Sequence, residues 1–150
     1  MKKISAIFLI CVLVLVGCGG GGQASKDEAV ALDYINTYLN GTDKEAKKKF
    51  VEEKVHPEAM PLFAMGMSLV TPEKNMYKNP KVIESTEYEK DGEKATLVLL
   101  TGTVDGKDKE IIILTMDGKV GFGFTPDSNS EDMKKNYEEM RSKFKTEPLK

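Results

Sequence analysis

The chain has no tryptophan, one histidine and two cysteines among its 150 residues. These shortages leave only scattered carboxylates for a metal site, because structural and catalytic zinc ions are held mainly by His and Cys. The thirteen glycines follow no three-residue period, which excludes a collagen-like chain, and a hydrophobic fraction of 40% excludes wholesale disorder. The net charge of −2 excludes a strongly basic, nucleic-acid-binding surface. The length fits one domain.

Long apolar runs without charge are also lacking, with one exception at the N-terminus. Residues 4–16, ISAIFLICVLVLV, follow Lys2 and Lys3. A run of thirteen residues fits the core of a secretory signal, about 7 to 15 residues, and is shorter than the about 20 residues of a membrane span. The sequence therefore predicts that residues 1–17 are a signal peptide and not part of the fold.

The end of this run, Leu15-Val16-Gly17-Cys18, resembles the lipobox of bacterial lipoproteins. The resemblance implies a diacylglyceryl thioether on Cys18, cleavage before that residue and an extracytoplasmic protein anchored to the bacterial cell membrane. Two or more acyl chains anchor a protein stably, whereas one gives only reversible binding. Cys11 would leave with the signal peptide and Cys18 would be capped, so no internal disulfide is expected. An ordinary signal peptide is the alternative.

Residues 18–25 contain Gly19–Gly22 and are predicted to be a flexible tether, with a single domain over residues 26–146. Three helices are expected at its start. Ser25 and Glu28 form a capping box for a helix that ends at Asn40 before Gly41, and Thr42 and Glu45 form a second one for the next helix. Residues 58–70 are apolar on nearly every side, so this third helix is predicted to be largely buried.

From residue 81 the pattern changes to the two-residue period of β-strands. Asp-Gly pairs at 91–92, 105–106 and 117–118 favour tight hairpin turns and delimit strands at about 82–90, 95–104, 110–116 and 119–125. In the last of these, Val120, Phe122 and Phe124 are expected on one face and Gly121 and Gly123 on the other. The pattern predicts an antiparallel meander.

The two middle strands are apolar on both faces, since residues 97–100 and 111–114 are all Leu, Val or Ile. Both faces of the sheet must therefore be covered. The three N-terminal helices can cover one, and a C-terminal helix over 131–145 has an apolar stripe for the other, formed by Met133, Tyr137, Met140 and Phe144. This favours a monomer. The alternative is a homodimer through the second face.

The predicted fold is thus α+β, with three N-terminal helices packed on a four-stranded antiparallel meander and a C-terminal helix added. Over residues 27–125 this order of helices and strands resembles that of small bacterial lipoproteins with a nuclear-transport-factor-like or cystatin-like domain. The segment DYINTYLNG at 33–41 also resembles these proteins. The resemblance implies a conical cavity between helices and sheet. Its expected lining is Phe63, Met67, Tyr88 and Phe122.

No enzyme or cofactor motif is present, so the expected function is non-enzymatic binding of an envelope protein or a small apolar ligand. One alternative is a small hydrolase or isomerase in which His56 acts as a base beside Glu53 or Glu58. Another is a structural component of the envelope, with its cavity filled by side chains.

Overall fold

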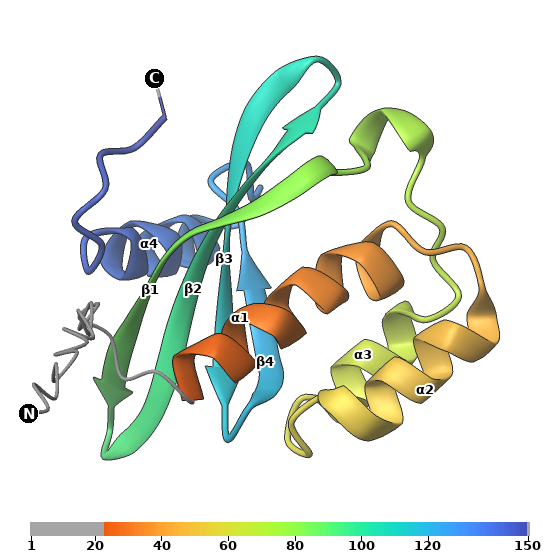
Figure 1. Ribbon diagram of the computed structural model, residues 1–150, viewed down its shortest axis with the longest axis horizontal. Coiled ribbons are helices and arrows are strands. Elements are labelled where there is room, and N and C mark those ends of the chain that lie inside the picture. The colour runs from red at the N-terminus through yellow and green to blue at the C-terminus, as the bar shows by residue number, and fades with distance from the viewer. Residues whose placement is uncertain (1–22, 150) are drawn as a thin grey trace, which may run out of the picture.

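The computed structural model describes residues 23–149 and has the predicted α+β architecture (Figure 1). One four-stranded antiparallel sheet, in the order β1-β2-β3-β4, lies between two helical layers. The first three helices cover one face and the C-terminal helix α4 covers the other. The predicted signal peptide and Cys18 lie outside the described residues, so the structure does not test them.

The sheet follows the predicted meander closely. Its strands are β1 (Lys78–Lys90), β2 (Glu93–Val104), β3 (Lys107–Met116) and β4 (Lys119–Phe124). Each hairpin turn is one of the three Asp-Gly pairs, and both residues of every pair have positive φ angles. Such angles are the requirement of the type I′ turn, which matches the twist of the strands that it joins.

The first two helices are placed as expected but differ at both N-caps. α1 (Gln23–Asp33) begins at Gln23, so Ser25 lies inside the helix and is not its cap, and residues 23–25 of the predicted tether are helical. The helix continues into a π-helical segment, η1 (Tyr34–Leu39), and ends at Asn40. A Cβ at Gly41 would lie 2.0 Å from the carbonyl oxygen of Thr37, which explains the glycine there. α2 (Lys44–Lys54) is capped by Asp43 and not by Thr42, because the Asp43 carboxylate accepts hydrogen bonds from the amides of residues 45 and 46.

The third helix departs from prediction in length and in burial. α3 (Met60–Gly66) is followed by an irregular stretch and a short 3₁₀ helix, η2 (Glu73–Asn75), before β1. Phe63 is the one buried residue of α3. The expectation that residues 58–70 are largely buried is wrong, because α3 packs through one side only and its apolar residues on the other sides face solvent.

The two faces of the sheet carry separate cores, as the double apolar pattern predicts. Facing α1, α2 and α3 are Val98, Leu100, Ile111 and Ile113. Facing α4 are Leu97, Leu99 and Ile112, packed with Tyr137, Met140 and Phe144. α4 (Glu131–Arg141) ends before Phe144, which still packs beneath it. The helix is therefore the second cover of the sheet.

A β-bulge in β4 changes one predicted side-chain direction. Leu114 pairs with Phe122 but Thr115 pairs with Val120, so Gly121 is an extra residue. An extra residue reverses the alternation of side chains along a strand. Val120 consequently packs in the core beneath α1, whereas Phe122 and Phe124 pack towards α4. The expectation that all three share one face is wrong for Val120.

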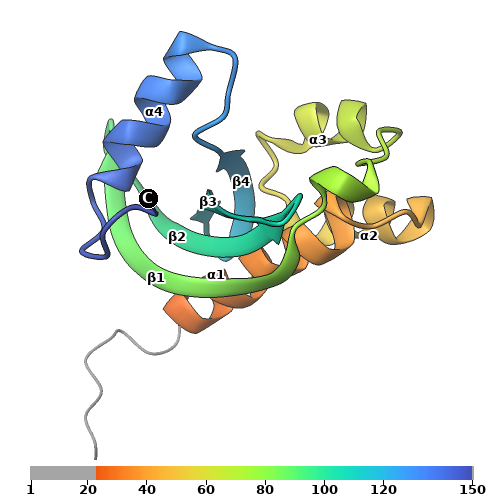
Figure 2. The ribbon, with the colours of Figure 1, turned by 90° about the horizontal axis from the view of Figure 1, so that it is seen from above.

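β1 curves around the side of the sheet on which α4 lies, and α1 lies outside this curve (Figure 2). Between α1 and the sheet, buried side chains occupy the space where the resemblance implies a cavity. They include Val30, Ala31, Tyr34 and Ile35. Within residues 23–149, no helix is long and apolar enough to cross a bilayer.

Candidate functional site

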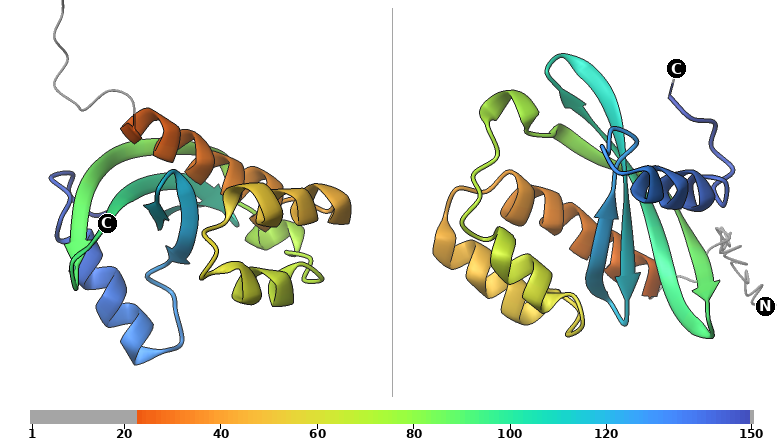
Figure 3. Two further views of the ribbon diagram at one scale, coloured as in Figure 1. Left: turned by 90° about the horizontal axis from the view of Figure 1, so that it is seen from below. Right: turned by 180° about the vertical axis from the view of Figure 1, so that it is seen from behind.

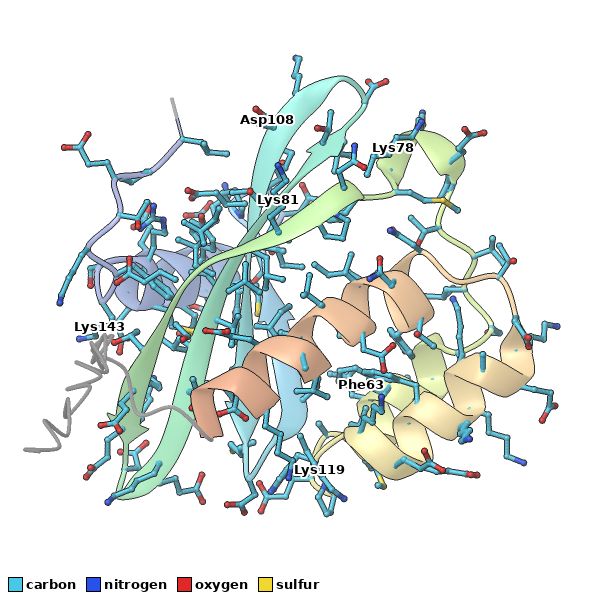
Figure 4. The ribbon with its side chains drawn as sticks, viewed as in Figure 1. Phe63, Lys78, Lys81, Asp108, Lys119 and Lys143 are labelled. Carbon is cyan, nitrogen blue, oxygen red and sulfur yellow. The ribbon has the colours of Figure 1, made fainter. Side chains whose placement is uncertain are left out.

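The four residues predicted to line one cavity are divided between the two faces of the sheet. Phe63 is buried where η1, α2 and α3 meet, and Met67 packs against the same core (Figure 4). Tyr88 and Phe122 belong to the core beneath α4. The sheet separates the two pairs, so the prediction of a common pocket is wrong. The sequence could not show this because it does not say which strand face meets which helix.

His56 has a structural role in this fold. Val55 forms a parallel bridge with Val120, and the His56 amide donates a hydrogen bond of 2.8 Å to the Val120 carbonyl, which attaches this segment to the edge of β4. Its Nδ1 atom is buried and has no hydrogen-bond partner among the described residues. The structure thus does not bring His56 into a hydrogen bond with Glu53 or Glu58.

A buried ion pair that sequence analysis missed lies between α4 and β3. Arg141 and Glu110 are 6% and 7% exposed. The Arg141 guanidinium donates from Nε to Glu110 Oε2 (3.0 Å) and from Nη2 to Oε1 (3.1 Å), which is the bidentate geometry that arginine forms with carboxylates. The Tyr137 hydroxyl donates a third bond, of 2.8 Å, to Oε2. Each charge is therefore compensated despite its burial.

This network changes the pKa values of its members. Burial alone raises the pKa of Glu110, but hydrogen bonds from Arg141, Tyr137 and the Leu149 amide, with the charge of Arg141, lower it below its ordinary value. Burial and the bond to Glu110 raise the pKa of Tyr137. Glu110 is hence a carboxylate, and Tyr137 a neutral hydroxyl, at neutral pH.

A cavity of about 690 Å³ opens beside this pair, lined by α4, the start of β3 and residues 142–149. Its apolar wall includes Phe144, Pro148 and Leu149. Two features of the sequence could have indicated the pair. Arg141 is the only arginine of a chain that otherwise uses lysine, and Glu110 stands directly before the apolar run of β3 on the face that meets α4.

The largest group of exposed apolar side chains lies on α3 and the segment that follows it. Leu62, Met65, Leu69 and Val70 are 51%, 78%, 69% and 60% exposed, and we call these four residues the α3 surface. Elsewhere in residues 23–149, Ile83 and Leu149 are the exposed large apolar residues. Exposed apolar residues that gather in one place are typical of interaction sites.

The α3 surface is held in position by contacts from behind. The Tyr38 hydroxyl donates a 2.6 Å hydrogen bond to the Phe63 carbonyl, and the Lys47 ammonium donates one of 2.9 Å to the Leu69 carbonyl. Lys47 is buried, and its Nζ lies 5.6 Å from the centre of the Tyr38 ring. It therefore differs from its neighbours Lys48 and Lys49, which are exposed.

No protein-family model, curated protein or solved structure matches the chain. Within the described part of the chain, no group of three or more His, Cys, Asp or Glu side chains is placed to hold a metal ion. Two features therefore remain as candidate sites: the exposed α3 surface, and the cavity beside Glu110 and Arg141.

Proposed function

We propose that the protein is a membrane-anchored extracytoplasmic lipoprotein, held by acyl chains on Cys18, whose domain binds a partner protein without catalysing a reaction. The observation that supports the binding role is the α3 surface, where four large apolar side chains are more than half exposed within nine residues. Covering such side chains is favourable, by about 25 cal/mol per Å² of apolar area.

The position of the α3 surface favours a protein partner over the bilayer. Residues 18–22 separate the proposed anchor from α1, and at their full extension Gln23 would be about 17 Å from Cys18. α1 and η1 together span 17 residues, about 25 Å of helix. Figure 3 shows α3 alongside α2, at the end of the molecule opposite the start of α1. The anchored end would face the membrane, and the α3 surface would face away from it.

The composition of this region indicates what kind of partner would fit. Residues 59–72, AMPLFAMGMSLVTP, contain no charged side chain, although 31% of the chain is charged. A complementary surface should likewise be apolar and free of unpaired charges, because burying a charge against these residues would be costly. Methionine side chains adapt to irregular contacts, and the hydrogen bonds behind the surface reduce the ordering that binding requires.

The anchor is tested by replacing Cys18 with Ser in the full-length chain expressed in a bacterial host. We expect the wild-type protein to sediment with membranes and its intact mass to include acyl groups and lack residues 1–17. The C18S variant should lose the acyl mass and leave the membrane fraction. An unmodified thiol on the wild-type protein, or residues 1–17 still attached to it, would contradict the proposed anchor.

The binding role is tested by placing a photoreactive amino acid at position 65 in cells of the native host. We expect cross-links to another protein, because Met65 is the most exposed residue of the α3 surface. Leu69→Glu should reduce the yield by about tenfold. Burying the unpaired Glu carboxylate at the contact would cost more than about 1.4 kcal/mol of binding free energy, and that energy corresponds to a tenfold change in affinity. Lys49→Glu, on an exposed part of α2, is the matched control and should leave the yield unchanged.

Cross-links to lipid would show that the surface enters the bilayer, and cross-links between copies of the chain would show self-association. Either result, or the absence of cross-links, would overturn the proposed partner. None of these three results bears on the anchor, which the intact mass decides separately.

A further inference from the structure

The segment after α4 crosses the sheet on the side away from α1 and is held by carboxylates from two strands. We call residues 145–149 the strap. It contacts Glu84 on β1, Glu110 on β3 and Arg141 on α4. These three side chains belong to elements far apart in the sequence, and the strap lies against all three between β1 and α4. We call this site the groove.

Main-chain atoms of the strap make nearly all of these hydrogen bonds. Only one bond uses a strap side chain, the Thr146 hydroxyl. The bonds run from Lys145 N to both oxygens of Glu84 (3.0 and 3.1 Å), from Thr146 N and Oγ1 to Glu84 Oε2 (2.9 and 2.8 Å), from Arg141 Nη1 to Thr146 O (2.8 Å), and from Leu149 N to Glu110 Oε1 (3.2 Å). Recognition of this kind depends little on the side chains of the bound segment.

The strap leaves the groove partly empty. All five of its residues are exposed, including Leu149 at 46%. Space of about 690 Å³ lies on its α4 side and about 390 Å³ on its β1 side, and both spaces are lined by Asp108, Glu110 and strap residues. A segment that is exposed and flanked by open space loses little packing when it leaves.

The groove retains its polar groups when the strap is absent. Glu110 and Arg141 remain bound to each other, but Arg141 Nη1 and the carboxylate of Glu84 lose their partners. The Arg141 contact is partly buried and the Glu84 contact is exposed, so a ligand that restores both bonds gains most at Arg141. Such a ligand needs two consecutive N–H donors that point the same way and a nearby carbonyl acceptor, which a polypeptide offers where its backbone bends, as the strap does at residues 145 and 146.

We propose that this groove, formed by Glu84, Glu110 and Arg141, is a peptide-binding site that takes a bent segment of polypeptide through its main chain, and that the strap occupies it as a built-in ligand. The site is separate from the α3 surface and does not depend on the function proposed for that surface. It contacts the main chain of its ligand, so a broad range of sequences should fit.

The test uses a synthetic peptide of residues 142–149, with blocked ends, and the full mature chain. In the wild-type protein the strap competes at an effective concentration in the millimolar range. Thr146→Pro removes one amide donor and the hydroxyl from the strap while leaving the groove intact. We expect T146P to bind the peptide about tenfold more tightly than wild type, and its Leu149 amide to exchange faster with solvent.

A second substitution distinguishes binding in the groove from binding elsewhere. Adding Glu84→Gln to T146P should abolish the gain in affinity, because it replaces the carboxylate that accepts the peptide amides. Adding Glu87→Gln is the matched control, since Glu87 is an exposed carboxylate of the same strand with no bond to the strap, and it should leave the affinity unchanged.

Two results would overturn the proposal. One is a T146P chain whose Leu149 amide exchanges fast but which binds no peptide at millimolar concentration. The other is a T146P chain whose strap remains as protected as in wild type, since the contacts with Glu84 would then not hold it.

Discussion

Arg141→Met is expected to lower the free energy of unfolding by about 3–5 kcal/mol, the usual cost of removing one partner of a buried ion pair. The substitution leaves the Glu110 carboxylate buried without its bidentate donor, although Tyr137 still donates to it. Urea unfolding followed by far-UV circular dichroism measures the change, because the chain has no tryptophan to report it by fluorescence.

The double variant Glu110→Met with Arg141→Met distinguishes the effect of an unpaired buried charge on stability from the effect of altered packing. Replacing both charges by apolar side chains is often neutral, so the double variant should regain most of the lost stability. Lys143→Met, two residues away and exposed, should change the stability by less than about 0.5 kcal/mol. A double variant as unstable as R141M would show that the loss comes from packing and not from the unpaired carboxylate.

The Glu110–Arg141 pair also predicts how the free energy of unfolding changes with pH. The pKa of Glu110 is lower in the folded chain than its ordinary value, so its contribution to stability is complete above about pH 4.3 and is lost as the pH falls through the folded-state pKa. The difference in stability between wild type and R141M should therefore shrink below about pH 4. A difference that stays constant from pH 7 to pH 3 would contradict this account.

Phe63→Ala is expected to lower the free energy of unfolding by about 3–5 kcal/mol, as for other buried phenylalanines. The Phe63 ring lies 4.9 Å from the Tyr38 ring and 5.7 Å from the Tyr34 ring, measured between ring centres. Its removal leaves a cavity where η1, α2 and α3 meet. The measurement is again urea unfolding.

Met65→Ala provides the comparison within the same helix. Met65 is exposed, so this substitution should change the stability by less than about 0.5 kcal/mol. Comparing the stability of the two variants thus distinguishes the buried residue that packs α3 against the domain, Phe63, from a residue of α3 that faces solvent, Met65. Equal losses in the two variants would mean that α3 packs differently from the structure described above.

Most of the fold could be predicted because its signals are local. The Asp-Gly pairs require positive φ angles, which places the three hairpin turns, and the double apolar pattern of β2 and β3 requires a cover on each face of the sheet. The stripe of Met133, Tyr137, Met140 and Phe144 follows from helical spacing alone.

The sequence alone could point to single residues such as Arg141 but could not locate the candidate sites, because each site depends on residues that only folding brings together. An apolar segment such as 59–72 has the same composition whether it is buried or exposed, and the contacts of Phe63 decide which of its residues face solvent. The bulge at Gly121 depends on pairing with β3. Glu84 and Thr146 are 62 residues apart in the chain and meet only because the strap crosses β1.

The amino-acid sequence by itself determined the order of the helices and strands, the three turns and the need for two covering layers, since each follows from neighbouring residues or from a period of two or 3.6. Only the tertiary structure decided that the predicted cavity residues lie on opposite faces of the sheet, that the α3 surface is exposed, and that Glu110 and Arg141 are buried together. The reason is that burial depends on what packs against a side chain, and its partners here lie far away in the sequence.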